Sequence, residues 1–507
     1  MTADTTDRIL QLIGAGRFDE AEQHCLLGRD CSGDHEYTYF LAIIRAQQKR
    51  FDEAIRFFED AARALPERAD IAFNFGVVCQ TAGDTEKAVE QWQRAAAIDP
   101  VHQDALYNAA LGCDRLGRTD EAERTYERLL EIDPEHLNGL YNLANLDVRL
   151  GKNEDALAHF RRLLDLKPDF EAAWINRAIA AQRTGDLAEA ERCFRQALSL
   201  NPESAEAHWN LSHLLLIQGR RREGFAEYEW RLERPEAPRP DWPQPAWDGT
   251  AAPDKRLLLW VDQGVGDAIQ FLRYARFAAE RVGEVFIQCQ DSLVRLAKTA
   301  PGIERAVALG EAVPDFDCHA PLMSLAHLLS MPEPAESWHG PYLSAAQDFA
   351  LESAAPGKRI GLVWAGNPAH RNDANRSCPV AALLPLLDLP DCAFYSLQVE
   401  PGADARQTMT ASGAITDLTP RLEDFADTAA AVQALDLVIS VDTAVAHLAG
   451  ALGKPAFVML PATDPDWRWL REGDETAWYP SLRLFRQASP GDWAGVIADI
   501  THALKKI

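Results

Sequence analysis

The two halves of this chain have different patterns of apolar and polar residues. The pattern of the second half predicts strands separated by helices. Short apolar runs, which favour buried strands, are followed by stretches with apolar residues three or four positions apart, which are typical of amphipathic helices. The strands are expected at 257–262, 284–289, 304–309, 359–365, 393–398, 437–441, 456–460 and 483–487. The helices are expected to begin near residues 267, 291, 322, 380, 425, 443 and 491. This alternation predicts parallel sheets with crossover helices.

The strands fall into two groups that are separated near residues 341–357. We therefore expect an α/β region of two Rossmann-like domains that face each other across a cleft, one over 257–345 and the other over 346–507. The segment before them, 235–256, is rich in proline and has no period. It is predicted to be a linker.

Residues 1–234 follow a longer period. Three residue types recur every 34 positions, namely Pro66, Pro100, Pro134, Pro168 and Pro202, then Ala54, Ala88, Ala122, Ala156 and Ala190, then Gly83, Gly117, Gly151, Gly185 and Gly219. The glycine turns the chain between paired helices, the alanine lets the helices approach, and the proline ends the second helix. This is the period of the tetratricopeptide repeat. We expect an α-solenoid of about six complete units and a last one that degrades after Gly219, where Gly224 replaces the alanine.

Asparagines recur with the same period on the first helix of each unit, at Asn74, Asn108, Asn142, Asn176 and Asn210. Asparagine is a mediocre helix former, and the first helices of such solenoids line the concave surface. A carboxamide can pair with both the N–H and the C=O of an extended peptide, so the ladder indicates a peptide-binding surface. The alternative is that these side chains tie neighbouring helices together.

Composition excludes several classes of protein. A net charge of -26 argues against a nucleic-acid partner or an anionic membrane surface. The nine cysteines form no CxxC pair, so neither a disulfide framework nor a zinc site is indicated. The first residues contain no basic and apolar segments of a signal peptide, and no apolar run approaches the ~20 residues of a membrane span. A cytoplasmic protein is expected.

The first expected strand runs into a turn with an acid. Gly264 and Gly266 precede Asp267 at the predicted start of a helix. The simplest role for Asp267 is helix capping. The glycines do not form the dinucleotide fingerprint, because Ile269 stands where its third glycine should be. No Gly-Lys-Ser/Thr follows as in a Walker loop, so neither NAD nor ATP is favoured and no cofactor is expected.

Two further polar segments follow strands in the second domain. Asp442 and Thr443 lie between a strand and a helix, and His447 lies one turn later on the side of Thr443. The N–H groups at such a helix start attract phosphate, although capping and packing would explain the same residues. The loop 364–377 holds five donors that suit a pyrophosphate, namely Asn367, His370, Arg371, Asn372 and Arg376.

Together these segments resemble the heptosyltransferase-like class of GT-B glycosyltransferases. The matching stretches are GVGDAIQF after the first strand, DTAVAHLAGALGKP at Asp442–Pro455 and PATDPDW at Pro461–Trp467. Their combination with the repeats resembles bacterial tetratricopeptide proteins with a heptosyltransferase-type domain, some of which glycosylate flagellin. The resemblance implies a GT-B fold whose first domain faces the acceptor and whose second domain binds a nucleotide sugar as substrate.

The resemblance also implies roles for single residues. Asp267 would be the general base of an inverting transfer, taking the proton of the acceptor hydroxyl. Thr443 and nearby N–H groups would hold phosphate, Asp442 would meet sugar hydroxyls, and Arg376 would take the place of the phosphate-binding cation. Arg376 and the helix dipole would meet the leaving-group charge, so no metal is expected.

Other residues border the same expected cleft. Asn367 and Gln398 lie at strand ends, and His447 follows Thr443 on one helix face. Four aromatics between 465 and 487 could stack a base or belong to the core, namely Trp467, Trp469, Trp478 and Tyr479.

Three functions remain open at the level of sequence. The first is an inverting, metal-independent glycosyltransferase that modifies a protein recruited by the repeats, with flagellin as the first candidate by resemblance. Only about 85 residues separate Leu257 from Pro341, fewer than in the first domain of heptosyltransferases, so the repeats are expected to supply the acceptor. The second is the same chemistry on a glycan or lipid-saccharide acceptor. The third is a peptide-binding scaffold without turnover.

Overall fold

A computed structural model describes residues 3–32, 34–238, 240–351, 357–370, 372–399 and 402–506. The chain divides into two compact units, Met1–Leu200 and Asn201–Ile507. The predicted end of the repeat region at residue 234 therefore lies inside the second unit. Helices α13 (Ala205–Ile217) and α14 (Arg221–Tyr228), which continue the repeat pattern, belong to that second unit.

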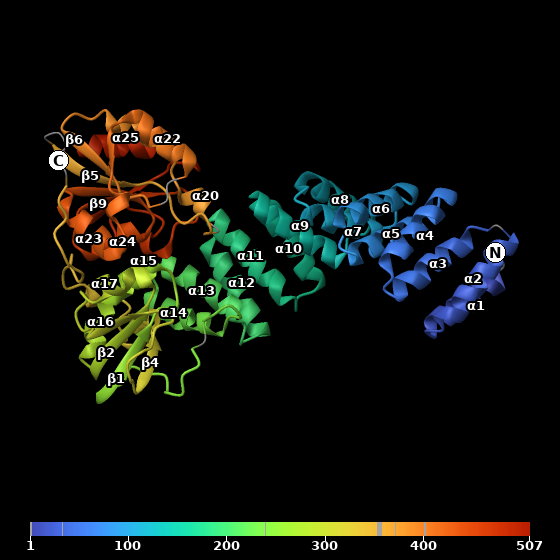
Figure 1. The fold of residues 1–507 in the computed structure, drawn as a ribbon, viewed down its shortest axis with the longest axis horizontal. Helices are drawn as coiled ribbons and strands as arrows, with labels where there is room; N and C mark the ends of the chain where they lie inside the picture. Colours follow the sequence, from blue (N-terminus) through green and yellow to red (C-terminus); the bar gives the residue numbers. More distant parts are fainter. Residues whose placement is uncertain are drawn as a thin grey trace. The chain divides into compact units, whose positions relative to one another are not determined.

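The first unit is an array of helix pairs, as the 34-residue period predicts (Figure 1). Its helices are α1 (Ala3–Gly14), α2 (Phe18–Ser32), α3 (Glu36–Gln47), α4 (Phe51–Ala64), α5 (Ala69–Thr81), α6 (Thr85–Ile98), α7 (Gln103–Arg115), α8 (Thr119–Ile132), α9 (Leu137–Leu150), α10 (Asn153–Leu166), α11 (Glu171–Thr184) and α12 (Leu187–Leu200). The turn glycines have left-handed backbone, for example φ 92° at Gly83 and 77° at Gly151, which glycine adopts without strain. Ala88 and Ala122 of the alanine ladder are fully buried.

The last helix pair has a glycine where its two helices approach. Gly224 of α14 stands where the other units have alanine, and a Cβ placed on it would lie 2.7 Å from Leu216 Cγ of α13. The glycine therefore permits a close contact between α13 and α14. Phe225 follows directly and sets its ring against Phe271 and Trp467, with centroids 6.0 and 5.7 Å away. The pair is thus part of the α/β core.

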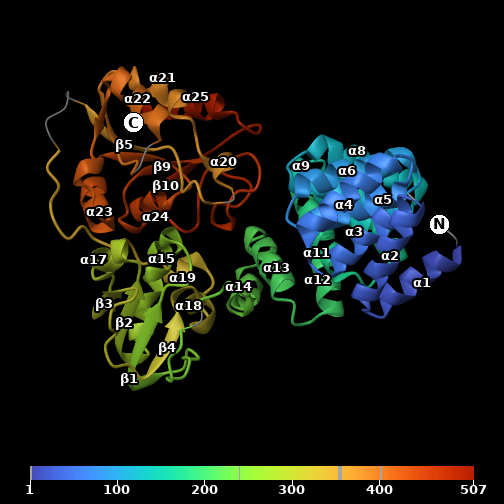
Figure 2. The same cartoon turned by 45° about the vertical axis from the view of Figure 1, so that its right-hand side comes forward.

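Two parallel sheets form the rest of the second unit (Figure 2). The first has the order β3-β2-β1-β4, with β1 (Ala252–Trp260), β2 (Val282–Cys289), β3 (Arg305–Ala308) and β4 (Cys318–Pro321). The second has the order β10-β9-β8-β5-β6-β7, with β5 (Lys358–Val363), β6 (Cys392–Ser396), β7 (Ile415–Asp417), β8 (Leu437–Val441), β9 (Ala456–Leu460) and β10 (Leu482–Arg486). The predicted strands are confirmed, whereas the short strands β4 and β7 were not expected.

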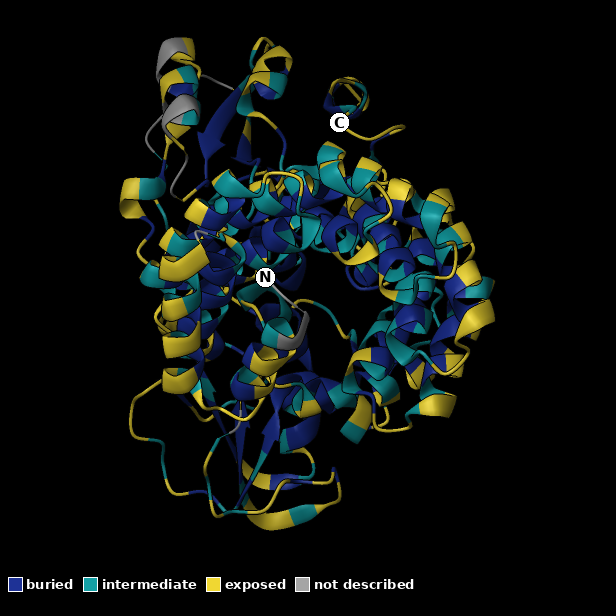
Figure 3. Cartoon of the chain, turned by 90° about the vertical axis from the view of Figure 1, so that its right-hand side faces the viewer, coloured by how far each residue is buried: buried dark blue, intermediate teal, exposed yellow. Residues whose placement is uncertain are grey.

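Helices cover these sheets, whose central strands are buried (Figure 3). The α-helices are α15 (Val265–Phe271), α16 (Ala275–Ala279), α17 (Val294–Ala297), α18 (Leu325–Leu328), α19 (Pro334–Ser337), α20 (Asp373–Arg376), α21 (Leu384–Leu387), α22 (Ala403–Ser412), α23 (Phe425–Ala434), α24 (Ala444–Ala451) and α25 (Trp493–Leu504). Single 3₁₀ turns are η1 (Glu229–Glu233), η2 (Leu272–Tyr274), η3 (Asp291–Leu293), η4 (Leu322–Ser324), η5 (Val380–Leu383), η6 (Thr419–Arg421) and η7 (Trp467–Trp469). Two parallel-sheet domains with this helical cover agree with the GT-B fold expected from sequence. Among the described residues, no helix has the length and apolar character needed to cross a bilayer.

Helices α15 and α24 bring the two sheets' strand ends together. Each begins directly after a central strand, α15 after β1 and α24 after β8. A Cβ placed on Gly266 would lie 3.0 Å from His447 Cδ2 and 3.5 Å from Ala444 Cα. A side chain here would be in tight contact with His447, so Gly266 favours the close approach of the two domains.

Candidate functional site

Asp267 lies in the first turn of α15, at the carboxyl end of β1. Its Oδ2 accepts a hydrogen bond from the Gly264 N–H at 3.1 Å, so the carboxylate does cap the helix start. The Asp267 side chain is 27% exposed. Burial raises the pKa of this carboxyl, while the nearby Arg468 guanidinium opposes the rise. A carboxylate with a raised pKa is a stronger base than an exposed one.

Arg468 is the cation of this cluster, and its guanidinium is 4% exposed. It lies in η7, after β9, and pairs with Asp267 Oδ1 and with Asp466, whose two oxygens are 3.0 and 2.9 Å from Nη1. Its Nε donates to Gln270 of α15. Asp466 belongs to the second domain, whereas Asp267 and Gln270 belong to the first, so Arg468 joins the two domains at the site.

The charge of Arg468 also acts on Asp466. Burial alone would raise the pKa of the Asp466 carboxyl, but the charge and hydrogen bonds of Arg468 lower it, so Asp466 is ionised. The sequence pattern did not indicate Arg468 or Asp466 as site residues, although both lie in or next to the PATDPDW stretch.

Asp442 and Thr443 lie at the start of α24, as predicted. Thr443 is the N-cap, but its Oγ1 is 3.0 Å from Ser440 Oγ and does not accept from the first turn of the helix. Asp442 is half-buried. Burial and the neighbouring Asp466 raise the pKa of Asp442 to about 6. The helix start therefore lies next to an acid that titrates near neutrality.

His447 faces the other domain from inside the core. Its Nδ1 is 3.0 Å from the Tyr479 hydroxyl, and its ring stacks on Trp469 with centroids 5.2 Å apart. Burial and then Arg468 lower the pKa of His447 to about 3, so the ring is neutral at pH 7. These contacts fit a packing role at the junction with Gly266.

Arg376 comes from the loop after β5 and reaches the start of α24. Its Nη1 donates to the Asp442 carbonyl at 3.2 Å, and its Nε is 3.6 Å from Asp373 Oδ1. The guanidinium lies over Gly366, where a Cβ would be 2.5 Å from Nη2. The structure thus brings Arg376, Asp442 and Thr443 together as predicted, although no contact tests their roles.

The rest of that loop is fixed by amide contacts. Asn372 Nδ2 donates to the Asp464 carbonyl at 3.2 Å and Asn375 Nδ2 to the Thr463 carbonyl at 2.8 Å. Asn367 is exposed, and its Oδ1 accepts from the Ala369 N–H at 2.9 Å within a local turn. Arg371 lies outside the described residues.

Gln398 holds two strand ends together. It is buried, and its Oε1 accepts from the N–H groups of Trp364 and Ala365 at 3.1 and 2.9 Å. Its amide oxygen is therefore engaged by the backbone at the end of β5. The structure gives Gln398 a supporting contact and leaves its predicted role at the nucleotide sugar untested.

The four aromatics considered for base stacking belong to the core. Their exposed fractions are 3% or less, namely Trp467, Trp469, Trp478 and Tyr479. Aromatic rings whose faces are covered by other side chains cannot stack on a nucleobase, so the prediction of base stacking is wrong. Trp478 and Tyr479 instead surround the buried Arg273, whose guanidinium lies 5.3 and 4.8 Å from their ring centroids.

The asparagine ladder is partly engaged between helices. The Nδ2 groups of Asn74, Asn142 and Asn176 donate to tyrosine hydroxyls 35 positions earlier, at 2.8, 3.2 and 3.2 Å. These partners are Tyr39, Tyr107 and Tyr141. These three asparagines therefore tie neighbouring helices together, which is the alternative to peptide binding given above.

Asn108 and Asn210 make no such contact, because the residue 35 positions earlier has no hydroxyl. Phe73 stands 35 positions before Asn108, and no hydrogen bond of the Asn108 side chain is found among the described residues. Ile175 has the same spacing from Asn210, which donates to the Glu206 carbonyl of its own helix at 2.8 Å. The peptide-binding role of the ladder stays a prediction.

Comparison with known families agrees with the two kinds of domain. Tetratricopeptide repeat models match residues 6–69, 80–136, 115–181 and 171–204. The model described as glycosyltransferase family 9 (heptosyltransferase) matches 398–470, which includes Asp442, Thr443 and Arg468. The chain therefore combines tetratricopeptide repeats with a glycosyltransferase family 9 domain.

Individual proteins are similar over parts of the chain. Protein FlbA of Caulobacter vibrioides is 27% identical over 330 residues, which cover 58% of this chain and 54% of FlbA. The chain thus spans about half the length of this curated relative. The solved repeat protein YrrB is 21% identical over 35% of this chain and 93% of its own, with a TM-score of 0.32. A repeat protein from Cytophaga hutchinsonii is 16% identical over 45% of this chain and 94% of its own, with a TM-score of 0.39.

The contacts of the ladder predict different costs for two equivalent substitutions. Asn142→Ala should destabilise the repeats by about 1 kcal/mol, because the Tyr107 hydroxyl loses its donor. Asn108→Ala should be neutral or slightly stabilising, since alanine is the better helix former. Urea unfolding followed by circular dichroism measures both. Equal effects of the two changes would show that the tyrosine contact carries no stability.

Arg468 should determine how stability at the site responds to pH. Arg468→Met leaves Asp267 and Asp466 without their cation and should cost about 3–5 kcal/mol at pH 7. Their pKa values then rise above the unfolded values, so the folded state takes up protons and the loss should shrink between pH 7 and pH 5. Denaturant unfolding at several pH values measures this difference from the wild type.

Arg486→Met is the matched control for this measurement. Arg486 donates to the carbonyls of Leu470 and Gly473 at 3.2 and 3.0 Å, which do not titrate. Its cost should therefore be the same at pH 5 and pH 7. A cost of Arg468→Met that does not change with pH would contradict the ion-pair account.

Proposed function

We propose that this chain is an inverting glycosyltransferase that moves a sugar from a nucleotide-sugar donor to a hydroxyl of a protein held by its repeats. A glycosyltransferase family 9 match over 398–470 supports the reaction class. The observation that carries the proposal is the meeting of two helix starts, where Gly266 of α15 lies against Ala444 of α24. Asp267 of one domain thereby lies near a helix start of the other, and this supports a donor phosphate site at that helix start.

The donor is proposed to bind at the start of α24. The unpaired N–H groups and the dipole of a helix N-terminus favour phosphate. Arg376 reaches the same point and can neutralise the charge of the departing nucleoside diphosphate. Asp442, half-buried next to it, is placed to accept hydrogen bonds from sugar hydroxyls.

Asp267 is proposed to be the base. It takes the proton of the acceptor hydroxyl while that oxygen forms a bond to the anomeric carbon from the face opposite the leaving group. The bond from the anomeric carbon to the phosphate oxygen breaks, and its electron pair leaves with the nucleoside diphosphate. One base and a single displacement give inversion at the anomeric carbon. The raised pKa of Asp267 favours this role over that of a fully exposed acid.

The repeats are proposed to hold the acceptor protein. A free carboxamide such as that of Asn108 offers donors and an acceptor to an extended backbone, and the bonded asparagines keep their carbonyl oxygens for further contacts. Flagellin is the first acceptor to test, as the sequence resemblance suggests. The nine cysteines are all free thiols, which fits a reaction in the reducing cytoplasm.

A glycan or lipid-saccharide acceptor is the second candidate. The heptosyltransferase description of the matched family favours it. Titration with a panel of nucleotide sugars, followed by intact-mass measurement of flagellin and of saccharide acceptors, separates the candidates. A mass gain of one sugar on the protein supports the proposal. Binding of no nucleotide sugar would remove both candidates.

Substitution of Asp267 separates its two roles. Asp267→Asn keeps an oxygen to accept from the Gly264 N–H but cannot take a proton. Turnover should fall on the order of 100-fold or more, while nucleotide affinity stays close to that of the wild type. Steady-state kinetics and calorimetry measure the two quantities. Asp291→Asn, an exposed acid at the start of η3 in the same domain, is the control and should turn over normally.

Arg376 should act on the donor alone. Arg376→Ala should weaken nucleoside diphosphate binding by ~1.5–3 kcal/mol if it makes a charge-assisted contact to phosphate. Arg359→Ala removes an arginine at the opposite end of β5, where it pairs with Asp436 at 2.6 Å, and should leave affinity unchanged. Calorimetry measures both. Unchanged affinity for Arg376→Ala would remove this residue from the donor site.

A further inference from the structure

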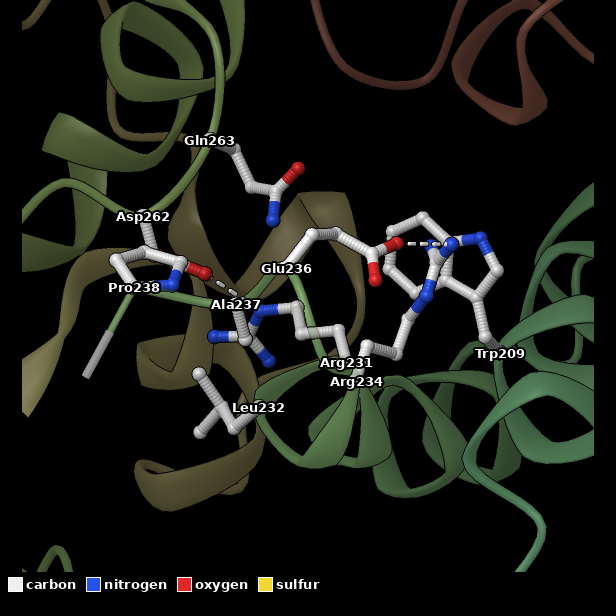
Figure 4. Close-up of a pocket in the computed structure, with 9 residues that line it drawn as sticks. All are labelled: Trp209, Arg231, Leu232, Arg234, Glu236, Ala237, Pro238, Asp262 and Gln263. Carbon is white, nitrogen blue, oxygen red and sulfur yellow. Dashed lines mark hydrogen bonds and ion pairs between the residues drawn. The ribbon is translucent and has the colours of Figure 1, made fainter. Parts of the chain in front are cut away.

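A pocket of about 210 Å³ lies in the second unit beside the turn that leads to Asp267 (Figure 4). Its walls come from α13 through Trp209, from η1 and the residues after it, and from Asp262 and Gln263 between β1 and α15. Asp262 precedes Asp267 by five residues. The charge of Asp262 acts on the Asp267 carboxyl, whose pKa it helps to raise, so the pocket lies close to the proposed base.

The floor of the pocket is rigid. The Arg231 side chain is 1% exposed and the Asp262 side chain is fully buried, with Arg231 Nε 2.7 Å from Asp262 Oδ2. The same guanidinium reaches Ser324 Oγ at 2.8 Å and the Tyr228 carbonyl at 3.2 Å. A buried guanidinium whose donors are all directed in this way holds the turn in one place.

The lining carries no net charge. Arg231 is paired with Asp262 and with Glu229, the latter at 2.8 Å. Arg234 is paired with Glu236 at the rim and lies 5.0 Å from the centroid of the Trp209 ring. An anionic saccharide would find no free cation among these residues, so the pocket suits an uncharged ligand.

Two polar side-chain groups of the lining have no hydrogen-bond partner within the described part of the chain. Asp262 Oδ1 is buried and accepts no hydrogen bond within the described part of the chain. For the Gln263 side-chain amide, half-buried at the pocket, no hydrogen bond is found among the described residues. A carboxylate oxygen needs a donor, and an amide offers both donor and acceptor. A polypeptide backbone, which alternates N–H and C=O, supplies both.

The sequence register relates the pocket to the repeats, which are proposed to hold a protein acceptor. Trp209 is the residue that follows Tyr107, Tyr141 and Ile175 at intervals of 34, directly before Asn210. The pocket wall thus uses the same position of the first helix as the tyrosine ladder of the repeats, and the proposed function favours a peptide over a neutral sugar as its ligand.

We propose that this pocket is the acceptor subsite, and that it takes an uncharged stretch of polypeptide next to the hydroxyl that receives the sugar. The inference rests on the proposed function for the chemistry of the adjoining base. It names the acceptor class, an uncharged peptide, and the residues Trp209, Asp262 and Gln263 as its contacts.

Photo-crosslinking tests the subsite without any donor. Benzoylphenylalanine replaces Leu232 in the pocket or, as a control, Leu309, which is 54% exposed on the surface of the same domain. The probes are two pools of twelve-residue synthetic peptides, one of Ser, Thr, Asn, Gln, Ala and Gly, the other with four positions replaced by Asp. Position 232 should capture the uncharged pool about fivefold better than the acidic pool, and position 309 should capture neither.

A charge change at the rim should alter the preference. Glu236→Lys removes the partner of Arg234 and adds a cation, so capture at position 232 should shift toward the acidic pool by about tenfold. Glu280→Lys, an exposed acid of the same domain outside the pocket, should leave the preference as it is. Because Glu236 is 63% exposed, this change should not affect folding.

Several outcomes would overturn the proposal. These are equal capture at positions 232 and 309, a preference that Glu236→Lys leaves unchanged, and loss of peptide capture in the presence of a neutral oligosaccharide such as maltotriose. Steady-state kinetics then test the acceptor subsite separately from the proposed function. Gln263→Leu should raise KM for a modified peptide about tenfold with nucleotide affinity within about twofold. Transfer with an unchanged KM would defeat the subsite alone, whereas peptide capture without transfer of any sugar would defeat the proposed function alone.

Discussion

The two α/β domains meet around the buried cation Arg468, and the candidate site depends on it. Helix N-termini favour acids, and two such termini converge here with three carboxylates, Asp267, Asp442 and Asp466. Three partly buried acids without a cation would repel one another. Arg468, 4% exposed, pairs with one acid from each domain. Its planar guanidinium has enough donors to do this and still reach Gln270.

The acids of this cluster differ in pKa because their surroundings differ. Asp466 makes two contacts with Arg468 and has a lowered pKa, whereas Asp442 lies next to Asp466 and has its pKa raised to about 6. Asp442 is therefore mostly ionised at pH 7, and the negative charge at the start of α24 decreases as the pH falls below about 6.

Sequence periodicity was sufficient to predict the structure wherever one residue spacing was repeated. The helix pairs and the longer strands could be predicted, and so could the approach of the helix starts next to Asp267 and Thr443, because both follow parallel strands. The strands β4 and β7 have only four and three residues, too few for a pattern. Arg468 could not be found, since its partner Asp267 is 201 residues away and only the fold brings them together. The tyrosines that engage the asparagine ladder could have been found, because Tyr39, Tyr107 and Tyr141 share one spacing to their asparagines.

Capping and catalysis at Asp267 are compatible for a geometric reason. An ionised carboxylate has about four acceptor positions. The Gly264 N–H uses one on Oδ2, and Arg468 uses one on Oδ1. The other two are left for an acceptor hydroxyl, and the side chain is 27% exposed, so a proton can reach it. The two contacts fix the carboxylate from both sides, which lowers the entropy that a reacting geometry must lose. The helix cap therefore orients the proposed base, and the domain contact made by Arg468 completes that orientation.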